Sequence, residues 1–166
     1  MKHFKLTSES KINFLGIKLF RIECTVDCKW AKIGDKGGWV EKEENLSGNA
    51  WVSGDAWVYG NARVSGDAEV SGNAWVYGNA RVSGNADYCC FQSFGSRYGT
   101  TTVFKQKDGT LRVRCGCFDG ALEEFEKKVE QTHGDNEFGK VYKAIIEVIK
   151  LRFNVRNQNQ QPPCQG

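Results

Sequence analysis

The chain of 166 residues contains only two prolines, only two histidines and no long hydrophobic run. Its apolar stretches fall short of the ~18 residues that a membrane helix needs, so we expect no membrane association. The first residues lack the apolar core of a secretion signal, so we expect a cytoplasmic protein. The net charge is only +3, which argues against binding a nucleic acid polymer.

The histidines and cysteines supply no recognisable metal site. Only His3 and His133 are present, so one chain cannot provide a site of three histidines. The seven cysteines are irregularly spaced, which is typical neither of a disulfide framework nor of paired zinc ligands. Cys24 and Cys28 alone have a zinc-like spacing, and no second pair accompanies them. We therefore expect no metal and no cofactor.

Residues 39–88 carry a six-residue repeat. Each unit reads aliphatic, Ser or Tyr, Gly, Asn or Asp, Ala, and then a variable residue. The aliphatic column consists of Val40, Leu46, Val52, Val58, Val64, Val70, Val76 and Val82. A fixed short period without insertions is typical of a solenoid, whose stacked coils share one core.

The repeat also predicts the shape of one coil. Alternation places alanine and the aliphatic residue inside and the variable residues outside. Gly followed by Asn or Asp predicts a corner, because Gly adopts positive φ freely and Asn or Asp tolerates it better than most residues. Three strands and three corners make a coil of 18 residues, and the segment 57–66 recurs unchanged at 75–84, 18 residues later.

Stacked coils of this length bring large aromatic residues together on one outer face. We assign this ladder to an interface; its members are Trp39, Trp57, Tyr59, Trp75 and Tyr77. An isolated monomer rarely exposes such a face. Three explanations remain open: cover by the carboxy-terminal helices, a subunit interface in a homodimer or homotrimer, and stacking with a nucleotide base.

The segment before the repeat, residues 1–38, predicts an amino-terminal β cap. Short strands flank a turn at Leu15-Gly16, and we interpret the run 35–38 as the entry into the first coil. We expect this cap to pair with the open edge of the solenoid. At the other end of the chain, residues 154–166 are rich in Gln and Asn, and we expect them to be disordered.

Residues 89–153 predict a β-hairpin followed by two helices. A two-residue turn at Asp108-Gly109 would pair Phe104 with Val113 and set Lys105 across from Arg112. The helices span about residues 121–133 and 137–153. Their expected buried residues are Leu122, Phe125 and Val129 in the first, and Phe138, Val141, Tyr142, Ile145, Val148 and Ile149 in the second.

The loop 95–102 is the best candidate for a binding site. Its glycines, hydroxyls and arginine could form a nest for an anion, and like charges on the neighbouring hairpin would be stabilised by that anion. The candidate ligand-binding residues are Gly95, Ser96, Arg97, Tyr98, Thr100, Thr101, Thr102, Lys105, Arg112 and Arg114. The alternative is an ordinary surface turn beside a solvated hairpin.

The repeat resembles the hexapeptide-repeat superfamily of left-handed β-helices over residues 40–88, although glycine stands at position three instead of two. The fold expected is therefore mainly β: a short three-sided left-handed β-helix of about three coils, with the amino-terminal β cap and the carboxy-terminal hairpin plus two α-helices. The chain after Ile17 also resembles a family of phage- and prophage-encoded hexapeptide-repeat proteins. That likeness lies in Gly95-Ser96-Arg97, the three threonines at 100–102, Cys115-Gly116-Cys117-Phe118 and Glu130-x2-His133-Gly134. It implies a viral protein in a bacterial cytoplasm and no particular activity.

Enzymes of the hexapeptide-repeat superfamily are mostly acyltransferases with a catalytic histidine or carbonic anhydrases with three. Neither histidine of this chain lies in the repeat, and Cys117 has no assigned base beside it. We therefore expect a non-enzymatic phage protein that sequesters a small anionic ligand, a nucleotide immune signal, to counter bacterial defence. The alternatives are a module that blocks a host defence protein and an enzyme acting on a nucleotide or acyl group.

Overall fold

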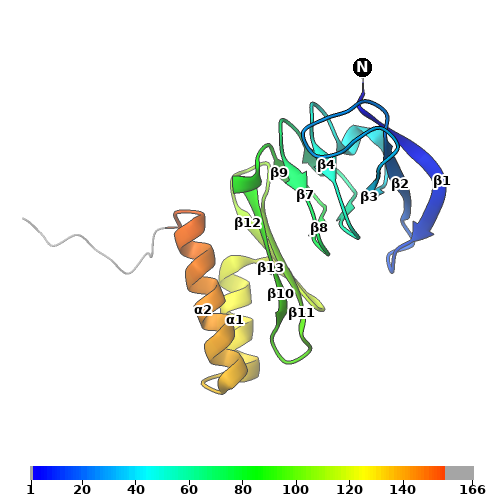
Figure 1. Ribbon diagram of the computed structural model, residues 1–166. Helices are drawn as coiled ribbons and strands as arrows, with labels where there is room; N and C mark the ends of the chain where they lie inside the picture. Colours follow the sequence, from blue (N-terminus) through cyan, green and yellow to red (C-terminus); the bar gives the residue numbers. More distant parts are fainter. Residues whose placement is uncertain (1, 156–166) are drawn as a thin grey trace, which may run out of the picture.

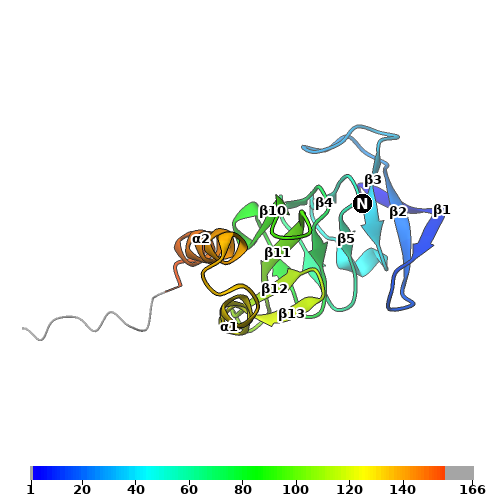
Figure 2. The same ribbon diagram turned by 90° about the horizontal axis from the view of Figure 1, so that it is seen from below.

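The computed structural model describes residues 2–155, which form a mainly β protein with two helices (Figure 1). The tail expected to be disordered lies outside the described residues, apart from positions 154 and 155. Figure 2 shows a row of three parts, with the strands of the cap at one end, the coil in the middle, and a sheet with its helices at the other end. Neither described helix is long and apolar enough to span a membrane.

The repeat forms a solenoid of very short strands. They are β4 (Trp51–Val52), β5 (Trp57–Val58), β6 (Arg63–Val64), β7 (Glu69–Val70), β8 (Trp75–Val76) and β9 (Arg81–Val82). Each pairs in parallel with a strand 18 positions away, so that Val52 lies beside Val70 and Val64 beside Val82. The aliphatic column and the alanines from Ala50 to Ala80 are buried, whereas Ala86, the last alanine of the repeat, is exposed. The period seen in the sequence is therefore the coil of the structure.

Glycine alone makes the tight turn at the corners. Gly66, for example, has φ +62°, and a Cβ added there would lie 2.7 Å from the carbonyl oxygen of Ser83 in the next coil. Among the described residues, no Asn or Asp of a corner has positive φ. The expectation that they would share this conformation was wrong, because one glycine per corner suffices. Corner side chains pair between coils instead, as when Asn49 donates to Asp67 at 3.0 Å.

The amino-terminal hairpin caps one end of the solenoid, as the sequence predicts. Strands β1 (Phe4–Ile12) and β2 (Lys18–Cys24) are antiparallel and turn at Gly16, where φ is +77°. Strand β2 pairs with β3 (Lys36–Val40), and β3 continues in parallel to β5. The hairpin thus extends one sheet of the coil and covers its open edge.

Residues 36–38 of the predicted entry into the first coil begin strand β3, which pairs in parallel with β5 of the coil. A Cβ at Gly37 would lie 2.5 Å from the side chain of Ile22, and one at Gly38 would lie 2.6 Å from that of Val52. These glycines therefore serve close packing between the cap and the core of the coil, while the turn lies earlier, at Gly34, with φ +89°. Close approach of two backbones, as well as turning, favours glycine.

An antiparallel sheet follows the coil and separates it from the helices. Its strands are β10 (Tyr88–Phe94), β11 (Gly99–Lys105), β12 (Leu111–Cys115) and β13 (Phe118–Ala121), and the helices are α1 (Leu122–His133) and α2 (Glu137–Arg152). Short 3-10 turns at Glu43–Asn45 and Asn85–Asp87 flank the coil. The helices pack on one face of the sheet through Val103 and Val113. The other face closes the solenoid, because Phe104 is fully buried in the core of the coil.

The register of the β11–β12 hairpin differs from the prediction by one residue. Phe104 lies opposite Arg112, and Lys105 lies opposite Leu111. The connection has three residues, 107–109, and Gly109 takes φ +83° at its end. A two-residue turn was assumed, whereas Gly in the left-handed region after a type I turn gives the three-residue form. Lys105 and Arg112 are therefore not a like-charge pair, and the predicted basic face does not form.

Helix α1 buries the three residues predicted for it, whereas α2 departs from prediction on one side. Its buried residues are Gly139, Tyr142, Ile145, Ile146 and Ile149. Phe138, Val141 and Val148 were expected inside but are 39%, 37% and 49% exposed. The helix is apolar over more than half of its circumference, so its sequence does not say which part meets the sheet.

Candidate functional site

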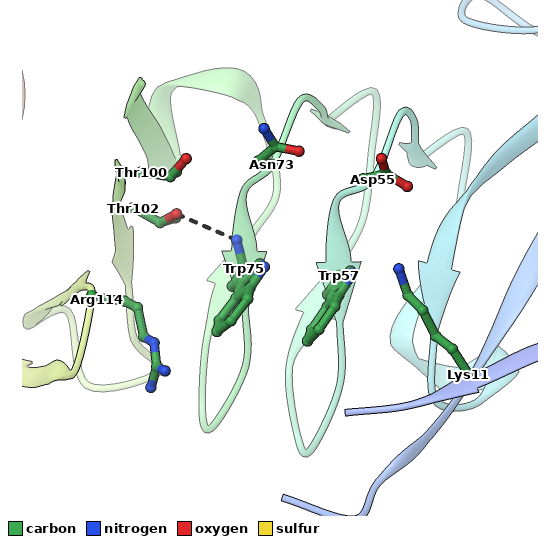
Figure 3. A pocket seen from close by; sticks show the side chains of 9 residues that line it. Lys11, Asp55, Trp57, Asn73, Trp75, Thr100, Thr102 and Arg114 are labelled. Carbon is green, nitrogen blue, oxygen red and sulfur yellow. Dashed lines mark hydrogen bonds between the residues drawn. The ribbon is translucent and has the colours of Figure 1, made fainter. Parts of the chain in front are cut away.

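An open cavity of about 400 Å³ lies on the aromatic face of the coil (Figure 3). Its lining residues are Lys11, Asp55, Trp57, Asn73, Trp75, Thr100, Thr102, Arg114 and Gly116. They come from the cap, two coils, strands β11 and β12, and the turn after β12. The cavity therefore exists only because the cap and the carboxy-terminal sheet meet over the same face of the solenoid.

Two parallel indoles form the centre of the cavity. The rings of Trp57 and Trp75 stack with centroids 4.5 Å apart and an angle of 6° between their planes. They stack because β5 and β8 pair in register. Both are half-buried, whereas Trp39, one coil earlier, is buried. Phe14, from the turn between β1 and β2, lies 5.5 Å from Trp75 at an interplanar angle of 23°.

The ladder is covered in part by the chain itself, but not by the helices. Tyr59 and Tyr77 stack at 5.1 Å and are buried beneath the sheet, where Arg112 and Arg114 lie over the ring of Tyr77. Burial raises the pKa of both tyrosines. Both helices belong to the other core, so the helices, one of the three explanations left open, do not cover the ladder. Trp39, Tyr59 and Tyr77 are buried within one chain, so they need no second subunit to cover them.

Arg114 is an unpaired cation beside the indoles. Its guanidinium carbon lies 4.9 Å from the ring centroids of both Trp75 and Phe14, and its Nε is buried without a hydrogen-bond partner among the described residues. Within residues 2–155 no carboxylate is close enough to pair with it. Arg112, two residues earlier, instead donates to Asp119 at 2.7 Å. Of these neighbouring arginines, only Arg114 is free to meet an incoming anion.

Lys11 supplies a second cation at the other end of the indole pair (Figure 3). Its Nζ lies 4.0 Å from the ring of Trp39 and 4.7 Å from that of Trp57, and burial lowers the pKa of its amine. One carboxylate, Asp55, lies at the rim and accepts a hydrogen bond from the indole N–H of Trp39 at 3.4 Å. The cavity thus combines two indoles, two cations and one carboxylate.

The ten predicted ligand-binding residues do not form one site. Thr100, Thr102 and Arg114 line this cavity, although the hydroxyl of Thr102 already accepts a hydrogen bond from the backbone N–H of Trp75 at 3.3 Å. Thr101 faces the helices, where it donates to the sulfur of Cys115 at 3.1 Å.

Lys105 is occupied by an ion pair with Asp87 at 3.0 Å, and Arg112 by the pair with Asp119 described above. Tyr98 is 77% exposed, with φ +49°.

Ser96, Arg97 and Thr100 border a second cavity, of about 220 Å³, on the helix side of the sheet. Its other lining residues are Phe94, Gly99, Cys115, Gly116, Cys117, Phe118, Phe125, Lys128, Val129, Thr132, His133 and Tyr142. Gly95 has φ +79°, and a Cβ there would overlap the hydroxyl of Tyr142, so both its backbone conformation and its packing favour glycine.

Five residues at or beside the main cavity were not predicted as site residues: Lys11, Phe14, Asp55, Asn73 and Gly116. Asp55 and Asn73 stand 18 positions apart at equivalent corners, so the coil period could have placed both beside the indoles. Nothing in the sequence indicates that Lys11 and Phe14 reach them, because the curl of the cap hairpin over the coil is a tertiary property.

The comparisons with known proteins concern the coil alone. Residues 56–72, 62–78 and 74–86 match the family model of the YdcK beta solenoid repeat. Searches of curated proteins and of solved structures gave no match. The match agrees with the pairing of strands 18 residues apart, and residues 56–86 are therefore a β-solenoid repeat.

Proposed function

We propose that the cavity around Trp57 and Trp75 binds a small anionic ligand with a flat ring, of which a nucleotide is the best representative. The observation that carries the proposal is the unpaired guanidinium of Arg114 beside half-buried indoles. Arginine recognises phosphate oxygens through two parallel hydrogen bonds. Aromatic walls attract any base, and a stacked base typically contributes ~1–3 kcal/mol. A volume of about 400 Å³ lies within the range of small-molecule sites.

The biological setting rests on the resemblance to phage-encoded hexapeptide-repeat proteins. We infer from it that the solenoid is a three-sided left-handed β-helix and that the protein works in the cytoplasm of an infected bacterium. A phage protein that binds nucleotides without turning them over can sequester a nucleotide immune signal. This role explains why the cavity is built from stacking rings and cations.

A second candidate function is the blocking of a host defence protein through the same face. The observation that favours it is the apolar tip of the cap hairpin, where Ile12, Phe14 and Leu15 are 71%, 58% and 60% exposed. Exposed apolar side chains grouped at one tip are typical of a contact with another protein. An enzyme acting on a nucleotide or acyl group ranks third, with Cys117 and His133 at the second cavity as the residues to test.

Calorimetric titration with a panel of linear and cyclic nucleotides tests the first proposal. We expect wild type to bind at least one of them, and Arg114→Ala to lose about ten- to a hundredfold in affinity, as follows from losing a charge-assisted hydrogen bond of roughly 1.5–3 kcal/mol. Phe14→Ala should weaken binding less, because Phe14 is mostly exposed. Binding should also weaken mildly at higher ionic strength.

Arg97→Ala is the matched control, because Arg97 is an exposed arginine that lines the second cavity and not the first. We expect it to bind like wild type. If only Arg97→Ala lost affinity for the nucleotide, the ligand would bind at the loop 95–102 and the second cavity, as predicted from the sequence. No heat from any nucleotide, together with retention of a host protein, would support the blocking function. Release of a product during the titration would indicate an enzyme.

A further inference from the structure

Helix α2 carries two apolar strips, and only one of them is used within the chain. The first packs against the sheet and α1. The second consists of Phe138, Val141, Ala144, Val148 and Leu151, and all five are exposed. Leu151 reaches 77% and Val148 49%. Figures 1 and 2 show α2 at the end of the molecule opposite the cap.

The spacing of the second strip matches the seam of a helix pair. Val141, Ala144, Val148 and Leu151 follow one another at intervals of three, four and three positions. This is the a and d pattern by which two helices pack side by side. A helix that is apolar on most of its surface is normally buried on most of it. We therefore expect the strip to pack against another helix.

The strip reads almost the same from either end, with Ala144 near its middle. In an antiparallel pair of identical helices, Val141 of one copy would face Val148 of the other, and Phe138 would face Leu151. Ala144 would meet its own counterpart near the two-fold axis. A small residue at that point lets two helices approach closely, and a two-fold axis is the commonest symmetry of soluble homo-oligomers.

The charges beside the strip favour the antiparallel arrangement. Lys140 and Glu147 border the same side of the strip, seven positions apart. Antiparallel packing brings Lys140 of each copy to Glu147 of the other, whereas parallel packing would place these residues on opposite sides of the helix pair, where they could not interact. Lys140 has no ion pair among the described residues, and Glu147 has only a long one, to Lys150 at 3.4 Å.

We propose that the second strip of α2 is the two-fold interface between two copies of this chain, with the helices antiparallel. The interface lies beyond the carboxy-terminal sheet, so it leaves the cavity of each copy uncovered. It does not depend on the proposed function, and its loss should leave ligand affinity unchanged.

The mass of the full chain in solution, measured by light scattering after size-exclusion chromatography, tests the proposal. We expect a dimer for wild type and a monomer for Val148→Glu. The matched control is Val26→Glu, at a position in the cap that is 43% exposed, and it should remain a dimer. A wild type that is monomeric or trimeric, or a Val26→Glu variant that dissociates as readily as Val148→Glu, would overturn the proposal.

A charge exchange tests the orientation and does not place a charge in the apolar strip. Lys140→Glu and Glu147→Lys should each weaken the dimer several-fold, because each creates two like-charge contacts per dimer. The double variant should restore the dimer, since it recreates both opposite-charge contacts in an antiparallel pair. Failure of the double variant to recover would exclude this arrangement. Circular dichroism of every variant establishes that the monomer remains folded.

Discussion

Strand pairing is determined differently in the coil and in the carboxy-terminal sheet. In the coil, every strand pairs with a strand 18 positions away, so Val58 lies beside Val76 and Trp57 beside Trp75. In the sheet, the residue that lies opposite a given residue depends on the length of the turn between the two strands. One extra residue in the loop 107–109 therefore changes every residue pair between β11 and β12. The coil is therefore insensitive to the details of a single turn, whereas the sheet is governed by them.

The largest expected effect concerns the junction between these two regions. Phe104 belongs to the sheet, yet it is fully buried in the core of the coil and meets Tyr77 edge-on at 5.4 Å. Phe104→Ala should lower the free energy of unfolding by about 3–5 kcal/mol, because it opens a cavity at the end of the solenoid. Urea denaturation followed by tryptophan fluorescence and by far-ultraviolet circular dichroism would measure it.

The two signals distinguish the regions, because all five tryptophans lie at or before residue 75 and both helices lie after residue 121. We expect one shared transition, shifted equally for both signals. If the helical signal kept its wild-type midpoint while the tryptophan signal moved, the coil and the sheet would be independent folding units.

A smaller effect is expected at the corners of the coil. Gly66 and Gly78 have nearly the same φ, +62° and +61°, but only at Gly66 does a following coil crowd the position of a Cβ. Gly78→Ala should cost about 1–2 kcal/mol from the left-handed backbone alone. Gly66→Ala should cost clearly more, and nucleotide affinity should change in neither. Thermal melting of the two variants gives the comparison, and equal losses would mean that the coils can separate without cost.

The smallest effect is expected at the ion pair between Lys105 and Asp87, which joins the sheet to the end of the coil at 3.0 Å. Lys105→Met should lower stability near neutral pH by at most about 1 kcal/mol, because the lysine is well exposed. Burial alone would raise the pKa of Asp87, but hydrogen bonds from Lys105 and Ser83 lower it below the ordinary value of 3.8.

A lowered pKa in the folded state means that the pair stabilises the protein above pH 3.8 and that this contribution fades as the pH falls further. The difference in melting temperature between wild type and Lys105→Met should therefore shrink in that acidic range. A difference that stays constant down to pH values well below 3.8 would show that the ion pair is not its source.

The amino-acid sequence by itself determined the solenoid, its 18-residue coil and the glycine corners, and the same repeat predicted the stacked indoles. This was possible because residues that stack in a solenoid are separated by a constant number of positions in the sequence. The repeat alone therefore predicts which residues are in contact. The two helices and the β cap were likewise predicted from periodicity and turn signals. Their boundaries needed no knowledge of distant contacts.

Only the tertiary structure decided the hairpin register, the exposed strip of α2 and the composition of the candidate site. Gly109 is compatible with a turn of two or of three residues, so the sequence does not decide the register. Helix α2 is apolar on so many sides that its sequence does not show which side packs against the sheet. The register of the hairpin places Arg114 beside Trp75, without an ion pair, whereas Arg112 donates a hydrogen bond to Asp119. Lys11 and Phe14 lie beside the indoles because the cap hairpin folds over the coil. Contacts between segments that share no repeat depend on how whole elements pack, and no local pattern encodes that packing.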